Sequence, residues 1–230
     1  MAYAQRVWPF AETRREDIAA HFAALKRQNP VIWNGRVLML ADYTVTDTTF
    51  RGTYFSVDFA SFIAWRDWGF PDSRVWDCFA MGALRGSDGA FLLGVMAATT
   101  SNPGLIYFPC GTPDSADIVG ERVDLDGNIA RELAEETGLD AGAFAVAPGW
   151  ITVIAGPWIA NMKLLQACEP ATAIRGRILD FLARQKKPEL ADIRIVHGPD
   201  DLDPMMPPHV VAYLRHMWQL TCGPPRAQRS

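Results

Sequence analysis

Apolar side chains spaced three and four residues apart predict several helices along the chain. In residues 14–28, for example, Ile18, Phe22 and Leu25 fall on one face of a helix. This spacing is expected when that face packs against a core. By the same criterion, helices are expected at residues 14–28, 59–68, 125–136, 171–184 and 208–220.

Continuous apolar runs predict the strands. Residues 75–84 and 90–96 are two such runs on either side of Ser87-Asp88-Gly89, a typical turn sequence, and they predict a β-hairpin. Residues 110–123, which are rich in Gly, Pro and Asp, are expected to form an irregular loop. Further strands are expected at residues 37–43, 53–57, 105–108, 150–154, 160–167 and 193–196. Because strands and helices are interspersed, the pattern predicts an α/β (α+β) fold in which helices cover a sheet.

A domain boundary is expected near residues 69–73, Gly-Phe-Pro-Asp-Ser, because Gly and Pro there are typical of a helix end followed by a turn. We therefore expect an N-terminal strand-and-helix extension over residues 1–72 and a larger domain over residues 73–222. Residues 223–230, which begin Gly-Pro-Pro-Arg, are expected to be a disordered tail.

Composition and charge limit the classes of partner. The chain of 230 residues is 49% hydrophobic and 21% charged, which excludes extended disorder and a collagen-like repeat. It has 22 basic and 26 acidic side chains, so its formal net charge is 22 − 26 = −4. A weakly acidic chain has no overall attraction for nucleic acid or anionic membranes, and neither is expected as a partner.

The location expected from the sequence is cytoplasmic. The N-terminal residues lack the apolar core of a secretory signal, and the most apolar stretch, residues 90–98, is about half as long as a membrane span. The four cysteines are widely spaced and form no Cys-x-x-Cys pair, which is typical of free thiols in a reducing compartment.

Residues 124–139 form the segment with the clearest chemical signal. Asp124 is a favourable residue at a helix start, because its carboxylate can accept hydrogen bonds from the free N–H groups of the first turn. Gly138 suits the left-handed conformation that commonly ends a helix. The helix predicted here therefore has well-marked ends.

Three carboxylates gather near the end of this helix. Glu132 and Glu136 are separated by about 40° around the helix axis and roughly 6 Å along it, with Glu135 on the flank. Like charges at such spacings destabilise a helix, and the helix dipole disfavours anions at its C-terminal end. A divalent cation such as Mg²⁺ removes this conflict, and Arg131 can ion-pair with a neighbouring acid. A solvated acidic helix face is the alternative that this pattern alone leaves open.

Residues 131–139, Arg-Glu-Leu-Ala-Glu-Glu-Thr-Gly-Leu, resemble the second half of the Nudix box, Arg-Glu-aliphatic-any-Glu-Glu-any-Gly-aliphatic, at all seven of its restricted positions. The first half differs, because its expected Glu falls on Val123 and its expected Gly on Asp117. Residues 108–111, Phe-Pro-Cys-Gly, resemble the segment that opens the box, but 12 positions then separate Gly111 from Val123 where the box has 6. Three acids of this longer loop are alternatives for the missing one: Glu121, Asp117 and Asp114.

The resemblance implies a Nudix-like α/β/α sandwich with a mixed sheet over residues 73–222. It also implies a hydrolase that cleaves a nucleoside diphosphate linked to another moiety, with Mg²⁺, or Mn²⁺ in its place, as cofactor. Gly111, where the box opens, is assigned by the resemblance to cofactor binding. A looser resemblance of residues 29–36 to the N-terminal part of UDP-sugar pyrophosphatases adds nucleotide sugars to dinucleotides as substrate candidates.

The resemblance also implies roles for single residues. Glu132 and Glu136 would be the main metal ligands, and Glu135 a further ligand or supporting acid. Arg131 would orient the carboxylates. Glu189, which precedes the last expected strand, is the candidate general base that takes a proton from the attacking water.

Two alternatives stay open at this point. The altered first half of the box favours a different class of function, a non-catalytic Nudix-fold module that binds a nucleotide to regulate a partner. The N-terminal extension either docks on its own chain or pairs with a second copy, so a homodimer is one of two arrangements.

Overall fold

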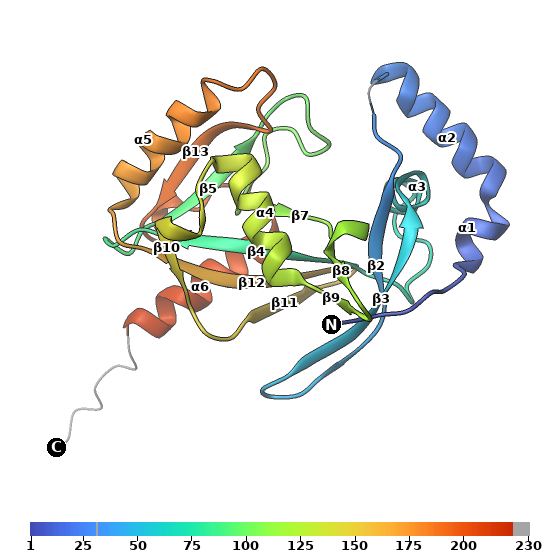
Figure 1. Cartoon of the computed structure of the whole chain (residues 1–230), viewed down its shortest axis with the longest axis horizontal. Helices are drawn as coiled ribbons and strands as arrows, with labels where there is room; N and C mark the ends of the chain where they lie inside the picture. Colours follow the sequence, from blue (N-terminus) through green and yellow to red (C-terminus); the bar gives the residue numbers. More distant parts are fainter. Residues whose placement is uncertain (31, 223–230) are drawn as a thin grey trace. The chain divides into compact units, whose positions relative to one another are not determined.

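The computed structural model describes residues 1–30 and 32–222 and has a mixed α/β fold with two mixed sheets (Figure 1). This confirms the predicted fold class. The chain divides into two compact units. Unit 1 comprises Met1–Ala80, Gly111–Asn128 and Gly156–Ile159, and unit 2 comprises Met81–Cys110, Ile129–Ala155 and the described residues from Ala160 onward. The predicted boundary at residue 72 stays a prediction, and the tail of residues 223–230 lies outside the described residues.

Unit 1 contains a five-stranded sheet in the order β2-β3-β1-β9-β8. Its long hairpin is antiparallel, whereas β1 runs parallel to β3. The strands are β1 (Ala2–Tyr3), β2 (Arg36–Val45), β3 (Phe50–Asp58), β8 (Ile118–Val119) and β9 (Arg122–Val123). The extension therefore pairs, through β1, with β9, which follows it in the chain by more than a hundred residues.

Three helices complete unit 1: α1 (Pro9–Thr13), α2 (Arg15–Gln28) and α3 (Phe59–Asp67). Asp58 caps α3, because its Oδ1 accepts a hydrogen bond of 2.8 Å from the N–H of Ser61. The core of this unit is aromatic. Trp8 lies edge-on to both Phe55 and Trp65, and all three side chains are buried.

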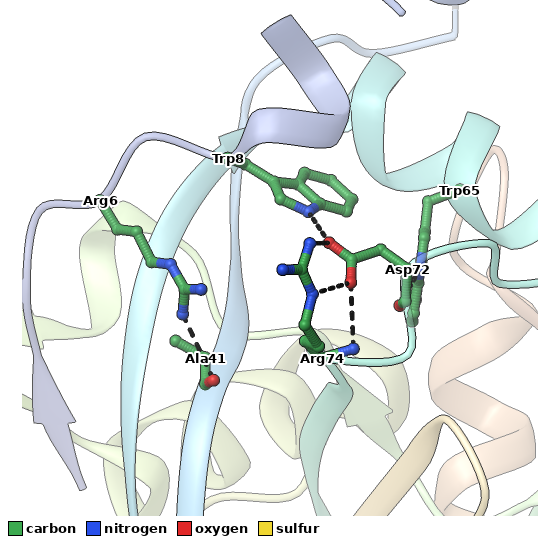
Figure 2. Close-up of polar contacts among 6 residues, drawn as sticks. All are labelled: Arg6, Trp8, Ala41, Trp65, Asp72 and Arg74. Carbon is green, nitrogen blue, oxygen red and sulfur yellow. Dashed lines mark hydrogen bonds and ion pairs between the residues drawn. The ribbon is translucent and has the colours of Figure 1, made fainter. Parts of the chain in front are cut away.

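Asp72 connects the start of the chain to residues 69–73 (Figure 2). Its Oδ2 accepts a hydrogen bond from the Trp8 indole at 3.1 Å, and its main-chain oxygen accepts one from the Trp65 indole at 2.9 Å. Its carboxylate also pairs with Arg74 at 3.0 Å. The turn sequence after α3 is thus held by hydrogen bonds within unit 1.

The second sheet has eight strands, with β10-β12-β4-β5-β13 in order, β11 beside β12, β6 beside β5 and β7 beside β4. The strands are β4 (Asp77–Arg85), β5 (Phe91–Met96), β6 (Ile106–Tyr107), β7 (Cys110–Gly111), β10 (Phe144–Val146), β11 (Ile151–Ala155), β12 (Trp158–Ala167) and β13 (Leu190–Val196). The predicted hairpin over residues 75–96 is confirmed, with Gly89 at φ 83° in its turn.

Three further helices lie on this sheet: α4 (Leu125–Thr137), α5 (Ala171–Leu182) and α6 (Pro208–Cys222). In unit 2, α5 packs against β13 and β5, and α6 packs against β11 (Figure 1). A Cβ added to Gly82 of β4 would lie 3.1 Å from Ile129 of α4 and 2.9 Å from Leu165 of β12. Glycine at this position therefore allows α4 to approach the sheet closely.

The expected helices and strands are present within a few residues of their predicted ends. The prediction of an irregular loop over residues 110–123 was wrong. The segment expected to be an irregular loop contains β7, the 3₁₀ turn Ser115–Asp117, β8 and β9. Strands of two residues are too short to show any periodicity in a sequence. The five-residue helix α1 was not predicted for the same reason. In the described part of the chain, no helix is both long and apolar enough to cross a membrane.

Candidate functional site

The helix α4 begins and ends as the sequence predicts. Asp124 Oδ1 accepts a hydrogen bond of 3.0 Å from the N–H of Gly127, which caps the first turn. Gly138 has φ 70°, and its N–H donates to the Ala134 carbonyl at 2.9 Å. The position and ends of α4 determine where its acidic side chains lie.

Four carboxylates of unit 2 interact through their charges: Glu132, Glu135 and Glu136 of α4, and Glu189. Glu136 is 4% exposed, the side chain of Glu132 is 14% exposed, and that of Glu135 is 63% exposed. Glu189 lies just before β13, where its main-chain oxygen accepts a hydrogen bond of 2.8 Å from Ala97. The acid cluster, as we call these four residues, therefore extends from a buried carboxylate to the surface.

Arg131 forms the ion pair expected from the sequence. Its Nη1 lies 2.7 Å from Glu132 Oε1 and 3.7 Å from Glu135 Oε2. The guanidinium therefore fixes the orientation of Glu132 more closely than that of the exposed Glu135. Glu136 is held differently, because its carboxylate accepts a hydrogen bond from the main-chain N–H of Cys110.

The charges of the acid cluster are incompletely compensated by the chain. Burial raises the pKa of Glu136 to about 9, and the neighbouring charges of Glu189 and Glu132 raise it further in the same direction. Burial also raises the pKa of Glu132 to about 7, although Arg131 acts to lower it. Within the described residues, Glu136 Oε2 is buried and has no hydrogen-bond partner. A buried acceptor without a partner costs free energy unless a ligand satisfies it.

The donor chemistry of the acid cluster fits a hard divalent cation. Mg²⁺ prefers carboxylate oxygens and keeps several of its waters, so few protein ligands are needed. The unpartnered Glu136 Oε2 is the atom that such an ion would satisfy. In residues 1–30 and 32–222, no group of three or more His, Cys, Asp or Glu side chains has the geometry of a metal site as it stands.

The longer loop uses its acids for its own structure. Asp117 is 6% exposed, and its Oδ2 accepts hydrogen bonds from the N–H of Asp114 at 2.9 Å and from Asn128 Nδ2 at 3.0 Å. Asp114 in turn caps the 3₁₀ turn through the N–H of Ala116. Glu121 is exposed, and Val123, at the position of the missing Glu, is buried. Gly111 lies half-buried in β7, and its assignment to cofactor binding stays a prediction.

Two neighbours of the acid cluster were not predicted as site residues. Tyr107 is buried next to Glu136 and Glu189, whose charges join burial in raising the pKa of its phenol. Its hydroxyl accepts a hydrogen bond of 3.3 Å from Asn102 Nδ2. Gln185 Nε2 donates to the main-chain oxygen of Glu135 at 3.3 Å. The only sequence signal for Tyr107 is that it directly precedes the segment 108–111, and Gln185 has none.

No family profile matches the sequence, and no curated protein matches it. Several solved structures are similar to the chain. A Nudix hydrolase from M. smegmatis, RenU, is 21% identical over 66% of this chain and 88% of its own, with a TM-score of 0.41. An Ap4A hydrolase from C. elegans is 16% identical over 63% of this chain and 98% of its own, with a TM-score of 0.46. The protein DR0079 from Deinococcus radiodurans is 14% identical over 80% of this chain and 99% of its own, with a TM-score of 0.48.

Proposed function

We propose that this chain is a metal-dependent Nudix pyrophosphohydrolase. It cleaves a nucleoside diphosphate linked to another moiety, a nucleotide sugar or a dinucleotide, by attack of an activated water. The observation that carries the proposal is the buried Glu136 Oε2 without a hydrogen-bond partner, set among three further carboxylates on and beside the helix that resembles the Nudix box. A helix built for stability alone would place basic residues at this end.

The carboxylates hold the cofactor in this proposal. Glu132 and Glu136 are the main ligands of Mg²⁺, or of Mn²⁺ in its place, and Glu135 is a further ligand or supporting acid. When bound, the ion neutralises charge on the pyrophosphate oxygens and lowers the pKa of a water. Arg131 keeps Glu132 in position through their 2.7 Å ion pair.

Glu189 is the proposed general base. It is exposed at the solvent side of the acid cluster, where it can receive a proton. A water oxygen forms a bond to phosphorus, the anhydride P–O bond breaks, and the leaving phosphate keeps the electron pair while the water proton goes to Glu189. Positioning and electrostatic stabilisation supply most of the rate in such transfers.

The test is hydrolysis of a nucleotide panel with Mg²⁺, Mn²⁺ or EDTA, with products separated by chromatography. We expect turnover that requires metal, and a loss of kcat of about 10²-fold or more in Glu136→Gln, because one carboxylate of the site is neutralised. Glu16→Gln, an exposed Glu of α2, is the matched control and should keep full activity. Absence of turnover on every substrate, or activity of Glu136→Gln equal to that of wild type, would contradict the proposal.

A second candidate is a non-catalytic module that binds a nucleotide to regulate a partner. The observation in its favour is the longer loop, in which Val123 is buried at the position of the box's first Glu and Asp117 is hydrogen-bonded within the loop. Calorimetry separates the two candidates. The module predicts nucleotide binding that does not need metal, whereas the enzyme predicts metal binding that weakens in Glu132→Gln and Glu136→Gln.

The proposal also covers the partner, the location and the domain organisation of the chain. The partner is a small nucleoside diphosphate derivative rather than nucleic acid or a membrane, and the location is cytoplasmic. Residues 1–72 are an extension to the hydrolase domain of residues 73–222. A homodimer through this extension is tested by the mass of the protein in solution.

A further inference from the structure

Tyr107 and Glu189 both lie at the end of β5 in unit 2. Tyr107, in β6, pairs with Gly94 of β5. On the other side of β5, the N–H of Ala97 donates a hydrogen bond of 2.8 Å to the main-chain oxygen of Glu189, the residue before β13. The backbone therefore holds both residues beside residues 94–97, although they are far apart in the sequence.

The hydroxyl of Tyr107 is held from one side only. Asn102 Nδ2 donates to it at 3.3 Å, and the N–H of Leu105 holds Asn102 through its main-chain oxygen at 3.2 Å. In the described part of the chain, the hydroxyl donates no hydrogen bond in return. Burial raises the pKa of the phenol well above its ordinary value, and the charges of Cys110 and Glu136 act in the same direction. The hydroxyl therefore keeps its proton and has no acceptor for it.

The carboxylate of Glu189 has the complementary need. It is exposed, and within residues 1–30 and 32–222 it makes no hydrogen bond and no ion pair. The other acids of the cluster are better held, because Arg131 orients Glu132 and a main-chain N–H binds Glu136. A general base works only within hydrogen-bond reach of the proton that it takes, so a carboxylate without a fixed orientation is a poor base.

The two side chains are close enough to satisfy each other. The charge of Glu189 is among those that raise the pKa of the Tyr107 phenol, so the two groups interact electrostatically. A hydroxyl oxygen that accepts from Asn102 directs its own proton away from that amide. The exposed side chain of Glu189 is free to rotate toward this proton. Catalytic hydrogen bonds are often long in a free enzyme and tighten when substrate binds.

We infer that Tyr107 is a positioning residue, whose hydroxyl donates a hydrogen bond to the Glu189 carboxylate and holds this base toward the attacking water. This inference rests on the proposed function and adds to it a residue outside the segments that resemble the Nudix box. Asn102 keeps the hydroxyl in place. Tyr107 touches neither metal nor phosphate in this assignment, so it acts on the rate only through Glu189.

A double-mutant cycle on the hydrolysis of the preferred nucleotide tests the inference. Tyr107→Phe removes the hydroxyl and keeps the ring. We expect its kcat to fall about tenfold with KM within about twofold of wild type, because a hydrogen bond to a charged group is lost. Glu189→Gln should lower kcat further, and adding Tyr107→Phe to it should change kcat by less than about twofold. Equal kcat of Tyr107→Phe and wild type, or a full tenfold loss on top of Glu189→Gln, overturns the inference.

Tyr213→Phe is the matched control, because Tyr213 is also a buried tyrosine of unit 2. Its hydroxyl has no hydrogen-bond partner in the described residues, and the charge that acts on it is that of Arg85 rather than an acid. Its kcat and KM should stay at the wild-type values. A loss equal to that of Tyr107→Phe would show that the loss of any buried hydroxyl lowers the rate, and the inference would be wrong.

NMR gives a readout that does not depend on turnover. With Mg²⁺ and pyrophosphate present, the hydroxyl proton of Tyr107 should give a signal, identified by its loss in Tyr107→Phe. Glu189→Gln should shift this signal, whereas Glu16→Gln, at an exposed residue of α2, should not. If wild type hydrolyses no substrate and the signal shifts, the proposed function fails and the contact stands. If substrates are hydrolysed and the signal is absent or unmoved by Glu189→Gln, the inference alone fails.

Discussion

The buried carboxylates of this chain are of two kinds, which differ in whether their oxygens accept hydrogen bonds. Asp117 is buried with its hydrogen bonds made, whereas Asp77 and Glu136 are buried with one carboxylate oxygen that has no partner in the described residues. The first kind stabilises a loop. The second kind carries a free-energy cost, which a ligand can offset only where the group lies beside other ligand atoms. Glu136 lies in such a cluster, whereas the charge that acts on the buried carboxyl of Asp77 is the cation of Arg66.

Asp77 leads to a prediction for stability against pH. Burial raises the pKa of its carboxyl from 3.8 to about 7, and Arg66 acts in the opposite direction. The folded chain therefore holds a proton that the unfolded chain releases, so this stabilisation is complete below pH 3.8 and is lost as pH rises through about 7.

Urea unfolding of wild type and Asp77→Asn checks this prediction between about pH 5 and pH 8. We expect the free energy of unfolding of wild type to fall more steeply with pH, by a difference on the order of a few kcal/mol. Asp47→Asn, an exposed aspartate in the turn of the β2–β3 hairpin, should follow wild type. Parallel curves for wild type and Asp77→Asn would contradict the assignment.

At the scale of elements, the end of α4 depends on one glycine. Gly138 has φ 70°, and a Cβ there would lie 2.4 Å from the ring of Phe181. Gly138→Ala should therefore lower the free energy of unfolding by about 1–3 kcal/mol, through backbone strain and the shift forced on α5. Gly176→Ala in α5 is the matched control, because a Cβ there meets nothing and alanine favours a helix by up to about 1 kcal/mol. Equal effects of the two substitutions on the free energy of unfolding in urea would contradict this prediction.

The longer loop between β7 and α4 gives another prediction at this scale. Replacing Asp117 with Ala leaves the N–H of Asp114 and the amide of Asn128 without their acceptor in a buried place. We expect a loss of about 1–3 kcal/mol in the free energy of unfolding and faster amide exchange at residues 114–123. Glu121→Ala, which removes an exposed acid of the same loop, should leave both measurements near wild type.

The elements show which features of the fold could be predicted from the sequence. The helix α4 was predicted with both ends because Asp124 and Gly138 act on neighbouring residues, so the signal is local. The short strands of residues 110–123 were not, because β9 is formed by pairing with β1 at the start of the chain. Likewise, the acids of α4 could be placed on one helix, whereas Gln185 and Tyr107 come beside them only through packing of distant segments.

At the scale of the whole molecule, the acid cluster makes the free energy of unfolding depend on metal binding. Ligands that bind only the folded chain stabilise it by mass action. In metal-free buffer near neutral pH, the chain must bind a proton at Glu136 when it folds, because burial raises the pKa of this carboxyl to about 9, so replacing it with a neutral side chain should help. Substitutions that abolish the function of such a site often stabilise the folded protein.

We therefore predict that Glu136→Gln reverses its rank with wild type as Mg²⁺ is added. With EDTA near pH 7, the variant should be more stable than wild type by about 1–2 kcal/mol and unfold at a higher temperature, because glutamine is neutral and does not have to take up the proton that the buried Glu136 carboxyl binds on folding. With Mg²⁺ in excess of its Kd, wild type should gain stability in proportion to the logarithm of the metal concentration, while the variant gains little. Calorimetric scans at several Mg²⁺ concentrations measure, for each protein, the slope of stability against the logarithm of the metal concentration. Glu16→Gln is the control and should keep the wild-type slope. Equal slopes for wild type and Glu136→Gln would mean that Mg²⁺ acts elsewhere on the chain, and the proposal that the carboxylates of α4 hold the metal would then be wrong.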